Sequence, residues 1–420
     1  MNKKTKEKRT IFSIDLKSFY ASVECVDRGL DPFKTPLVVC DKERGTNTII
    51  LAVTPYLKER GVPSRLRLKE LPKDIPNIIY AKPRMTRYME RSVEVVSIFL
   101  DYVAKDDLHT YSIDESFLDV TDYLKINNCT AVEYAQRILK DVKDKTNLIC
   151  TCGIGENIFM AKCAMDIEAK HNKNFIAEWS YKDIPNKLWP VTPLSKMWGI
   201  GPRLEKRLND LGIYSIGDIA ASEYNLLKNK FGVIGEEIYN HSYGRDEALI
   251  GTEYTPESRS LSVGQVLMRD YNYIEMEQIV KDMVEELGEK LRHEKKLAGG
   301  ISLFILYSGE LGGFAKQFSL PRPTDSNNEI LNIALMIYRA YIQDLPIRRI
   351  GLFAFNLSER EYQQMDLFTD FDELDKEYKY NTVMDAIKSK YGKNSIVKAN
   401  ALLKESNALT RNKQIGGHSE

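Results

Sequence analysis

The sequence predicts an α/β protein of several domains, and three features of the chain lead to this prediction. It has 420 residues, 43% of them hydrophobic, which is more than one ordinary core accommodates and indicates two to four domains. Helical and strand-like patterns alternate between residues 10 and 180, as in a layered α/β fold. Residues 258–358 follow the order strand, helix, strand, strand, helix, strand, which is typical of a small self-standing domain.

The elements of the first layer follow from the recurrence of apolar residues. Residues 11–53 predict a strand, a helix and two further strands, of which 48–53 is the last. Prolines interrupt the pattern across residues 54–83. Beyond them, the pattern predicts helices at about 86–104, 131–145 and 157–170, the last capped by Asn157, and strands at 148–154 and 175–179.

The second half of the chain has a different character. Residues 185–245 predict short helices separated by glycines. After Ser358 the chain is polar and is expected to be loosely ordered, although residues 380–403 have helical and basic character. Between these segments lie the predicted strands 259–268, 300–307, 313–320 and 349–357 and the predicted helices 274–296 and 329–344.

Composition narrows the possible environment of the protein. Lys and Arg together number 60, as do Asp and Glu, so net charge gives no hint of a nucleic-acid partner. The six cysteines form no CxxC pair, and the spacing of Cys150 and Cys152 favours packing on one face of a strand over zinc binding. No apolar run reaches about 18 residues, and the basic residues 1–10 lack the apolar core of a signal peptide. We therefore expect a soluble, cytoplasmic protein without a membrane partner.

Three carboxylates interrupt or end predicted strands. Asp15 ends a short apolar strand, and Asp114 and Glu115 are adjacent within another β-prone run. If the two strands are neighbours, the three carboxylates converge and need a divalent cation to remain ionised together. Oxygen ligands alone favour Mg²⁺ over Zn²⁺. Each motif has a structural alternative, since Asp15 would also suit a helix cap and Asp114 and Glu115 a hairpin turn; the two motifs together favour metal binding.

Two further features suit a phosphate-bearing partner. Residues 57–91 contain ten basic and four acidic residues, an excess of six positive charges that suits a polyphosphate or a nucleic-acid backbone, although a solvated surface explains any single one of them. Gly199 and Gly201 precede a predicted helix that carries Arg203, Lys206 and Arg207. Backbone amides at such a helix start bind phosphate well, which predicts a helix-hairpin-helix grip on DNA.

The last predicted domain and the segment after it provide two more candidate contacts. The predicted strands carry arginines, Arg259 and Arg269 among them, whereas the two helices carry most of the acid, which suggests a sheet face towards nucleic acid and a helical face towards water. Residues 364–368 (QMDLF) form a compact, apolar-tipped peptide in a charged stretch. It suits either a short helix on its own protein or a linear peptide that enters a partner's groove.

Taken in order, residues 15–24 (DLKSFYASVE), 112–119 (SIDESFLD) and 199–201 (GIG) resemble the Y-family, or translesion, DNA polymerases. The likeness covers roughly residues 10–405 and is strongest to the bacterial single-chain members of the UmuC branch. It implies a right-hand polymerase with a ferredoxin-like palm (10–54 and 84–180), small fingers (55–83) and a helical thumb (185–245). A little-finger domain (246–360) and a C-terminal tail (361–420) complete the expected division.

The resemblance also implies roles for particular residues. Asp15, Asp114 and Glu115 would hold two Mg²⁺ ions with help from the Leu16 carbonyl. Tyr20 matches the family's steric gate against the ribose 2′-hydroxyl, with Phe19 packed beside it. Lys58 falls at the place of a triphosphate-binding arginine, while Pro55 rather than Tyr56 falls at the place of its companion tyrosine; Lys170 aligns with a triphosphate-binding lysine. The peptide Gln364, Met365, Asp366, Leu367 and Phe368 looks like the bacterial motif that binds the sliding clamp.

The implied function is low-fidelity, template-directed DNA synthesis across damaged bases, with primer-template DNA, dNTP, the sliding clamp and possible damage-response accessory proteins as partners. Two other functional classes share some of these features. A nucleotidyl cyclase shares paired carboxylates but needs neither a helix-hairpin-helix nor a clamp peptide. A non-catalytic or partner-dependent DNA-binding accessory subunit predicts the loss of a carboxylate, and all three are present.

Overall fold

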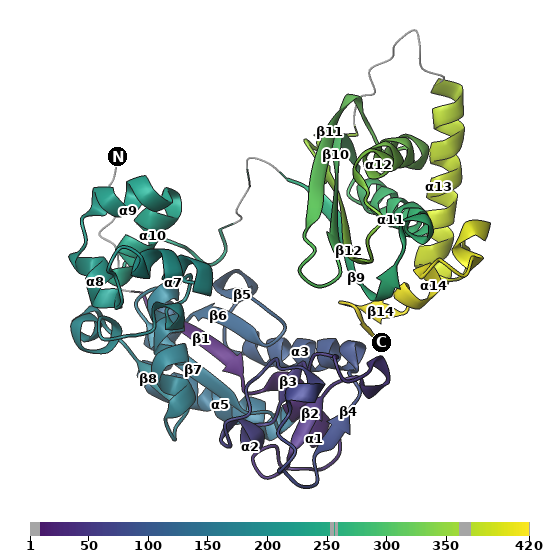
Figure 1. Cartoon of the computed structure of the whole chain (residues 1–420). Helices are drawn as coiled ribbons and strands as arrows, with labels where there is room; N and C mark the ends of the chain where they lie inside the picture. Colours follow the sequence, from purple (N-terminus) through teal and green to yellow (C-terminus); the bar gives the residue numbers. More distant parts are fainter. Residues whose placement is uncertain (1–8, 253–255, 257–258, 361–370, 420) are drawn as a thin grey trace. The chain divides into compact units, whose positions relative to one another are not determined.

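The computed structural model describes residues 9–252, 256, 259–360 and 371–419 (Figure 1). The chain forms two compact units, Met1–Glu253 and Tyr254–Glu420. Each unit has its own sheet and its own apolar core. Within the described residues, no helix is both long enough and apolar enough to cross a membrane.

The first unit is built on a five-stranded sheet in the order β5-β6-β1-β7-β8. The central strand β1 is antiparallel to both of its neighbours, and β8 is parallel to β7. The ring of Phe12 packs near Tyr134 of α5, whereas Ile11, one residue away, packs with Ile158 and Ala161 of α6. The two helices therefore cover opposite faces. The strands are β1 (Ile11–Leu16), β5 (Leu108–Thr110), β6 (Glu115–Asp119), β7 (Cys150–Gly155) and β8 (Ile176–Glu178), and the helices are α3 (Met85–Phe99), α4 (Thr121–Asn127), α5 (Ala131–Thr146) and α6 (Ile158–Cys163).

Two glycines in β7 let α6 approach the sheet closely. A Cβ atom on Gly153 would lie 2.1 Å from the Ala161 carbonyl oxygen, and one on Gly155 would lie 2.3 Å from the Ala161 nitrogen. Any larger residue would push the helix away from the sheet. This close packing sets the position of every side chain that α6 and its continuation present to β1.

A smaller sheet lies beside the first and has the order β3-β2-β4. The strand predicted at 48–53 is shorter than expected, because only Ala52 and Val53 pair with β2. Val38 and Val53 share an apolar cluster with Leu57 and Leu66, so the predicted palm–fingers boundary at residue 54 falls inside one packed cluster. The elements here are α1 (Phe19–Val26), β2 (Leu37–Val39), β3 (Ala52–Val53), α2 (Pro55–Lys58) and β4 (Ile79–Ala81).

Residues 181–245 form the short helices that the sequence predicts. They pack in one cluster with residues of α6 and β8, so this segment belongs to the same compact unit as the sheet. The longer helices are α7 (Pro202–Asn209), α8 (Ile216–Ala221), α9 (Tyr224–Phe231) and α10 (Val233–Ser242).

The strands and helices of the second unit follow each other in the predicted order, which is confirmed. Its sheet has the order β11-β10-β12-β9 with all neighbours antiparallel, and α11 and α12 pack on one face of it. The short β13 (Ser358–Glu359) adds to β10. The other elements are β9 (Leu261–Tyr271), α11 (Tyr273–His293), β10 (Lys296–Tyr307), β11 (Gly313–Thr324), α12 (Asn327–Tyr341) and β12 (Ile347–Phe355).

The prediction of a loosely ordered segment after Ser358 is wrong for the residues that the structure describes there. Helix α13 (Phe371–Tyr391) runs beside α11 and buries Asn381 and Met384 (Figure 1). Shorter elements follow at α14 (Ala408–Arg411), β14 (Gln414–Ile415) and β15 (His418–Ser419). The order comes from contacts with residues about 100 positions earlier, which a local pattern does not reveal.

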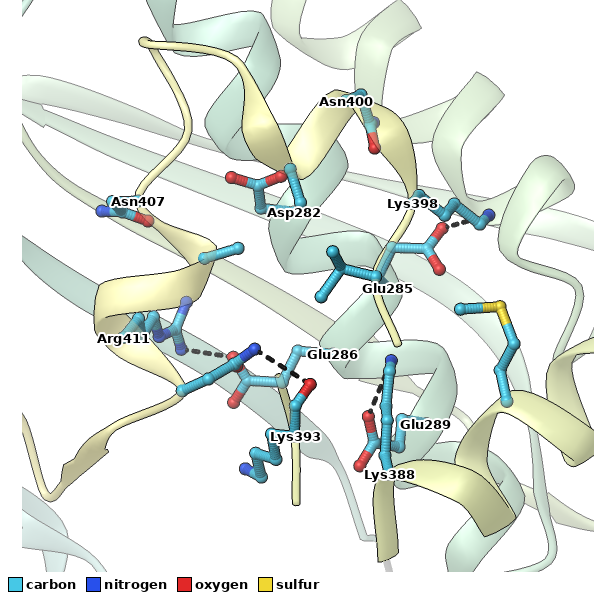
Figure 2. Close-up of a pocket in the computed structure, with 15 residues that line it drawn as sticks. Asp282, Glu285, Glu286, Glu289, Lys388, Lys393, Lys398, Asn400, Asn407 and Arg411 are labelled. Carbon is cyan, nitrogen blue, oxygen red and sulfur yellow. Dashed lines mark hydrogen bonds and ion pairs between the residues drawn. The ribbon is translucent and has the colours of Figure 1, made fainter. Parts of the chain in front are cut away.

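The acidic face of α11 meets the basic C-terminal segment, as Figure 2 shows. Lys398 Nζ lies 2.6 Å from Glu285 Oε1, and an Arg411 guanidinium nitrogen lies 2.7 Å from Glu286 Oε2. The expectation that this helical face points to water is therefore corrected, since opposite charges from the end of the chain cover much of it.

Candidate active site

The antiparallel pairing of β1 and β6 sets Asp15 directly opposite Glu115. Opposite residues of an antiparallel pair project to the same face of a sheet, here the face that α6 covers. The Leu16 amide donates a hydrogen bond to the Asp114 carbonyl oxygen at 2.8 Å, which fixes the third acidic residue beside the pair. The predicted neighbouring of the two strands is confirmed.

The structure also decides between the alternatives for the acidic residues. Asp15 lies within β1, and Ser18, not Asp15, is the residue that precedes α1. Asp114 lies in the loop between β5 and β6, where the Ser112 hydroxyl donates to Asp114 Oδ1 at 2.7 Å. Asp15 is thus no helix cap, whereas Asp114 does lie in the connection of a β-hairpin.

The electrostatic environment of Asp15 is that of a crowded acidic site. Burial raises the pKa of the Asp15 carboxyl to about 6 against the lowering effect of the Lys170 ammonium, and the charges of Asp114 and Glu115 add to the rise. Within the described ranges, no three His, Cys, Asp or Glu side chains form a ready-made metal site. The donor chemistry nevertheless fits Mg²⁺, because Asp15, Asp114 and Glu115 all offer carboxylate oxygens. Asp15 and Glu115 also project to the same face of the sheet.

One lysine within α6 and one in the turns after it compensate the carboxylates. Lys170 Nζ lies 3.3 Å from Asp15 Oδ2, so the structure brings this candidate residue to the carboxylates. Lys162, which the sequence analysis missed, lies 2.8 Å from Glu115 Oε2, and Asp166 contacts both lysines. The sequence held a signal for them, since lysine, aspartate and lysine recur at intervals of four residues from 162 to 170.

The other predicted nucleotide-binding residues lie near the carboxylates. Phe19 is buried and Tyr20 half-buried at the start of α1, with ring centroids 5.7 Å apart. Burial raises the pKa of Tyr20, and the nearby charge of Asp114 adds to this rise. Desolvation lowers the pKa of Lys58 on α2, although its side chain keeps solvent contact, and the charges of Asp15 and Asp114 oppose the change.

The predicted DNA-binding hairpin exposes its glycines. Gly199 has a φ of +92°, Gly201 immediately precedes α7, and both are exposed together with Arg203. Ile200 between the glycines is 4% exposed and joins the apolar cluster below. The loop is therefore anchored by one side chain while the backbone on either side faces outwards.

The other residues predicted to contact DNA or a partner differ in how free they are to do so. Arg259 is exposed before β9, whereas the Arg269 guanidinium pairs with Glu275 at 2.8 Å and lies over the ring of Tyr271. Part of the positive charge over residues 57–91 is paired with an acid from outside that range, since Arg84 and Arg87 both contact Asp27. The peptide of residues 364–368 lies outside the described residues.

Comparison with known proteins places this arrangement in a family. The impB/mucB/samB family model matches residues 14–166, the impB/mucB/samB family C-terminal domain matches residues 258–367, and the IMS family HHH motif matches residues 181–213. A Y-family DNA polymerase chimera of known structure has a TM-score of 0.65 and 21% identity, and the match covers 83% of this chain and 99% of that one.

Two curated relatives from Bacillus subtilis (strain 168) match nearly end to end. The chain is 37% identical to "Putative UV-damage repair protein UvrX", with 98% of both chains covered. It is 31% identical to "DNA polymerase IV 2", with 98% of this chain and 99% of the relative covered. The chain belongs to the impB/mucB/samB family and is a Y-family, DNA-directed DNA polymerase.

Proposed function

We propose that this polymerase copies damaged DNA templates with low fidelity and that Asp15, Asp114 and Glu115 hold two Mg²⁺ ions with the Leu16 carbonyl. The observation that carries the proposal is the pairing of Asp15 opposite Glu115 at the end of neighbouring strands in a member of this family. Bound Mg²⁺ at such a site supplies activation of the primer 3′-hydroxyl and neutralisation of the leaving pyrophosphate.

The side chains around the carboxylates bind and orient the nucleotide in this proposal. Lys170 and Lys58 offer positive charge to the triphosphate, and both lie within electrostatic reach of Asp15. Tyr20 lies under the sugar and excludes a 2′-hydroxyl, while Phe19 fixes the start of the helix by packing beside it.

Tolerance of damaged bases is attributed to the small fingers. Residues 55–83 contain the short helical segments α2 and Leu68–Glu70 and the three-residue strand β4, around a small apolar cluster. A segment of about thirty residues encloses a nascent base pair incompletely, so a distorted template base meets fewer clashes. The same openness lowers the discrimination against wrong nucleotides.

The residues proposed to bind the DNA backbone are the hairpin Gly199–Gly201 with Arg203, and Arg259. Arg269 serves this role only if it exchanges Glu275 for a phosphate. Residues 364–368 are proposed to bind the bacterial sliding clamp, because tethering raises the effective concentration of a polymerase whose own grip is weak. Damage-response accessory proteins are further candidate partners.

Primer extension tests the proposal. The native chain and Asp114→Asn are given Mg²⁺ and dNTPs on an intact template and on one with an abasic site. Extension past the lesion by the native chain alone supports both the activity and the carboxylate assignment. Equal synthesis by the two chains contradicts the assignment of Asp114, and synthesis that always stops at the lesion contradicts damage bypass.

The absence of synthesis by either chain would favour a partner-dependent or accessory role. Addition of the sliding clamp and damage-response factors then separates the two: activity that appears only with a partner indicates a dependent enzyme, and continued inactivity indicates a DNA-binding accessory subunit.

A further inference from the structure

One carboxylate near the proposed active site belongs to none of the roles assigned above. Asp166 contacts two lysines at once: its Oδ2 lies 3.1 Å from Lys162 Nζ, and its Oδ1 lies 2.8 Å from Lys170 Nζ. A single carboxylate that uses both oxygens on two ammonium groups fixes each relative to the other.

The backbone at this place is built for the contact. After α6, residues Ala164–Glu168 form a π-helical turn and Ala169–His171 a tighter one, with the Ala169 amide bonding back to the Ala164 carbonyl. An α-helix has about 3.6 residues per turn, so residues four apart drift sideways along it. A wider turn offsets that drift and keeps Lys162, Asp166 and Lys170 on one side of the segment.

The two lysines complete a chain of alternating charges. Lys162 Nζ lies 2.8 Å from Glu115 Oε2, and Lys170 Nζ lies 3.3 Å from Asp15 Oδ2. Asp15 and Glu115 face each other across β1 and β6, so the chain of contacts returns to the pair from which it starts. Asp166 stands at its centre and is the member farthest from that pair along the chain of contacts.

The two halves of this network differ in exposure. Each lysine has two acidic partners, but the Lys162 side chain is 9% exposed whereas the Lys170 side chain is 32% exposed. The contact of Lys170 with Asp166 is also shorter than its contact with Asp15. Asp166 thus fixes the Lys170 ammonium by its shorter contact, while the Lys170 side chain stays accessible to solvent and hence to a ligand.

We propose that Asp166 is a positioning residue for the incoming nucleotide: it holds the Lys170 ammonium at the entrance of the carboxylate site, and Lys162 anchors Asp166 to Glu115. The proposal rests on the proposed function, in which Lys170 binds the triphosphate. If Asp15 held a cation, Lys170 would be free to exchange its longer contact with Asp15 for a phosphate oxygen while keeping its contact with Asp166.

Steady-state primer extension tests the proposal on the full chain with varied dNTP. Asp166→Asn keeps the shape of the side chain and removes its charge. It is expected to raise the KM for dNTP about tenfold, with a much smaller change in kcat and in the affinity for primer-template DNA, because a ground-state contact is lost. Asp166→Glu restores the charge and is expected to recover part of the loss.

A double-variant cycle with Lys170→Met separates positioning from a general structural effect. If Asp166 acts through Lys170, then Asp166→Asn adds little to the KM defect of Lys170→Met. Fully additive defects, or an unchanged KM for dNTP in a folded Asp166→Asn chain, would overturn the proposal. Thermal unfolding checks that the variants fold, and if Asp166→Asn does not fold, Asp166→Ser is judged by the same criteria.

The matched control is the Lys140–Asp144 pair, which has the same spacing on α5 but lies exposed and away from the carboxylates. Asp144→Asn is expected to leave the KM for dNTP unchanged. Failure of the proposed function is a separate result, because the native chain itself would then not extend a primer, whereas failure of the present proposal leaves native synthesis intact.

Discussion

The ring of Tyr20 stacks on the ring of Tyr88, with centroids 4.4 Å apart and planes inclined by 16°. Tyr88 is fully buried in α3, and its hydroxyl donates to Glu24 Oε1 at 2.7 Å. Arg84 also donates to the Glu24 carboxylate, at 2.9 Å. The ring assigned to sugar selection therefore rests on a second ring that a hydrogen bond holds in place.

Tyr20→Ala is expected to admit ribonucleotides. Without the ring, the space beneath the sugar accommodates a 2′-hydroxyl, and discrimination against rNTP should fall by on the order of 100-fold, the equivalent of about 3 kcal/mol of steric repulsion. Competition between rNTP and dNTP in primer extension measures this ratio. Unchanged discrimination in the variant would remove Tyr20 from the gate.

Tyr88 provides a second, independent test of the gate. Tyr88→Leu removes the stacked ring and leaves Tyr20 free to tilt, so discrimination against rNTP should weaken by roughly tenfold, the equivalent of an aromatic contact of about 1.4 kcal/mol. Tyr88→Phe keeps the ring and loses only the hydrogen bond to Glu24, and serves as the control. If the two variants discriminate equally well, stacking does not orient the gate.

The carboxylate site illustrates what a sequence reveals and what it conceals. Asp15 and Glu115 were predictable because each lies in an apolar strand, where a carboxylate is energetically unfavourable and therefore indicates a function. Tyr88 and Glu24 were not, since a tyrosine and a glutamate on amphipathic helices look like ordinary half-exposed residues. Their role appears only when α1 and α3 come together, 64 residues apart in sequence.

The second unit shows the same limit at the level of the fold. Its strands and helices were predictable because α11 and α12 have strongly periodic apolar faces. Helix α13 begins well before the predicted helical segment. Polar contacts order it instead of a continuous apolar stripe: Glu377 in its first half accepts hydrogen bonds from the Ser326 hydroxyl and the Asn328 amide, and Asp385 farther along pairs with Arg292. Pairing between residues 93 positions apart leaves no local periodicity to detect.

The contact between Arg292 and Asp385 is expected to anchor α13. The Arg292 side chain is only 6% exposed and lies 2.6 Å from the Asp385 carboxylate, so Asp385→Ala leaves a buried positive charge without its anion. We expect the free energy of unfolding of the second unit to fall by about 2 kcal/mol. Urea unfolding of the full chain, followed through the transition of this unit, measures the loss.

Asp375→Ala on the same helix is the control. Asp375 and Lys379 form a pair with both side chains largely exposed, so its removal should leave the transition nearly unchanged. Equal effects of the two substitutions would mean that the burial of Arg292 does not matter to the docking of α13.

His241 should make the stability of the first unit depend on pH. Burial lowers the pKa of His241 below its usual 6.5, although Asp246 and Glu237 oppose the shift, and its ring stacks on Phe159 with centroids 4.1 Å apart. In the unfolded chain His241 binds a proton near pH 6.5, whereas in the folded unit it binds a proton only at a lower pH. The His241 contribution is therefore present above pH 6.5 and is lost as the pH falls through the lowered folded-state pKa.

His241→Phe keeps an aromatic ring and removes this titration. The melting temperature of the first unit should fall less in the variant than in the native chain when the pH is lowered from about 7.5 to 5.5. Identical pH dependence in the two chains would show that the pKa of His241 is the same in the folded and the unfolded state.

Residues 364–368 give the last prediction, which concerns the proposed clamp. Deletion of these five residues should abolish stimulation by the sliding clamp and leave extension of a short primer intact, because the carboxylates proposed to be catalytic lie in the other unit. Deletion also shortens the connection between β13 and α13, which both belong to the second unit. Replacement of Met365, Leu367 and Phe368 by alanine keeps that length and removes only the apolar tips. Stimulation that disappears in both variants assigns the tether to the side chains, whereas stimulation that survives the alanine replacement places clamp binding elsewhere in the chain.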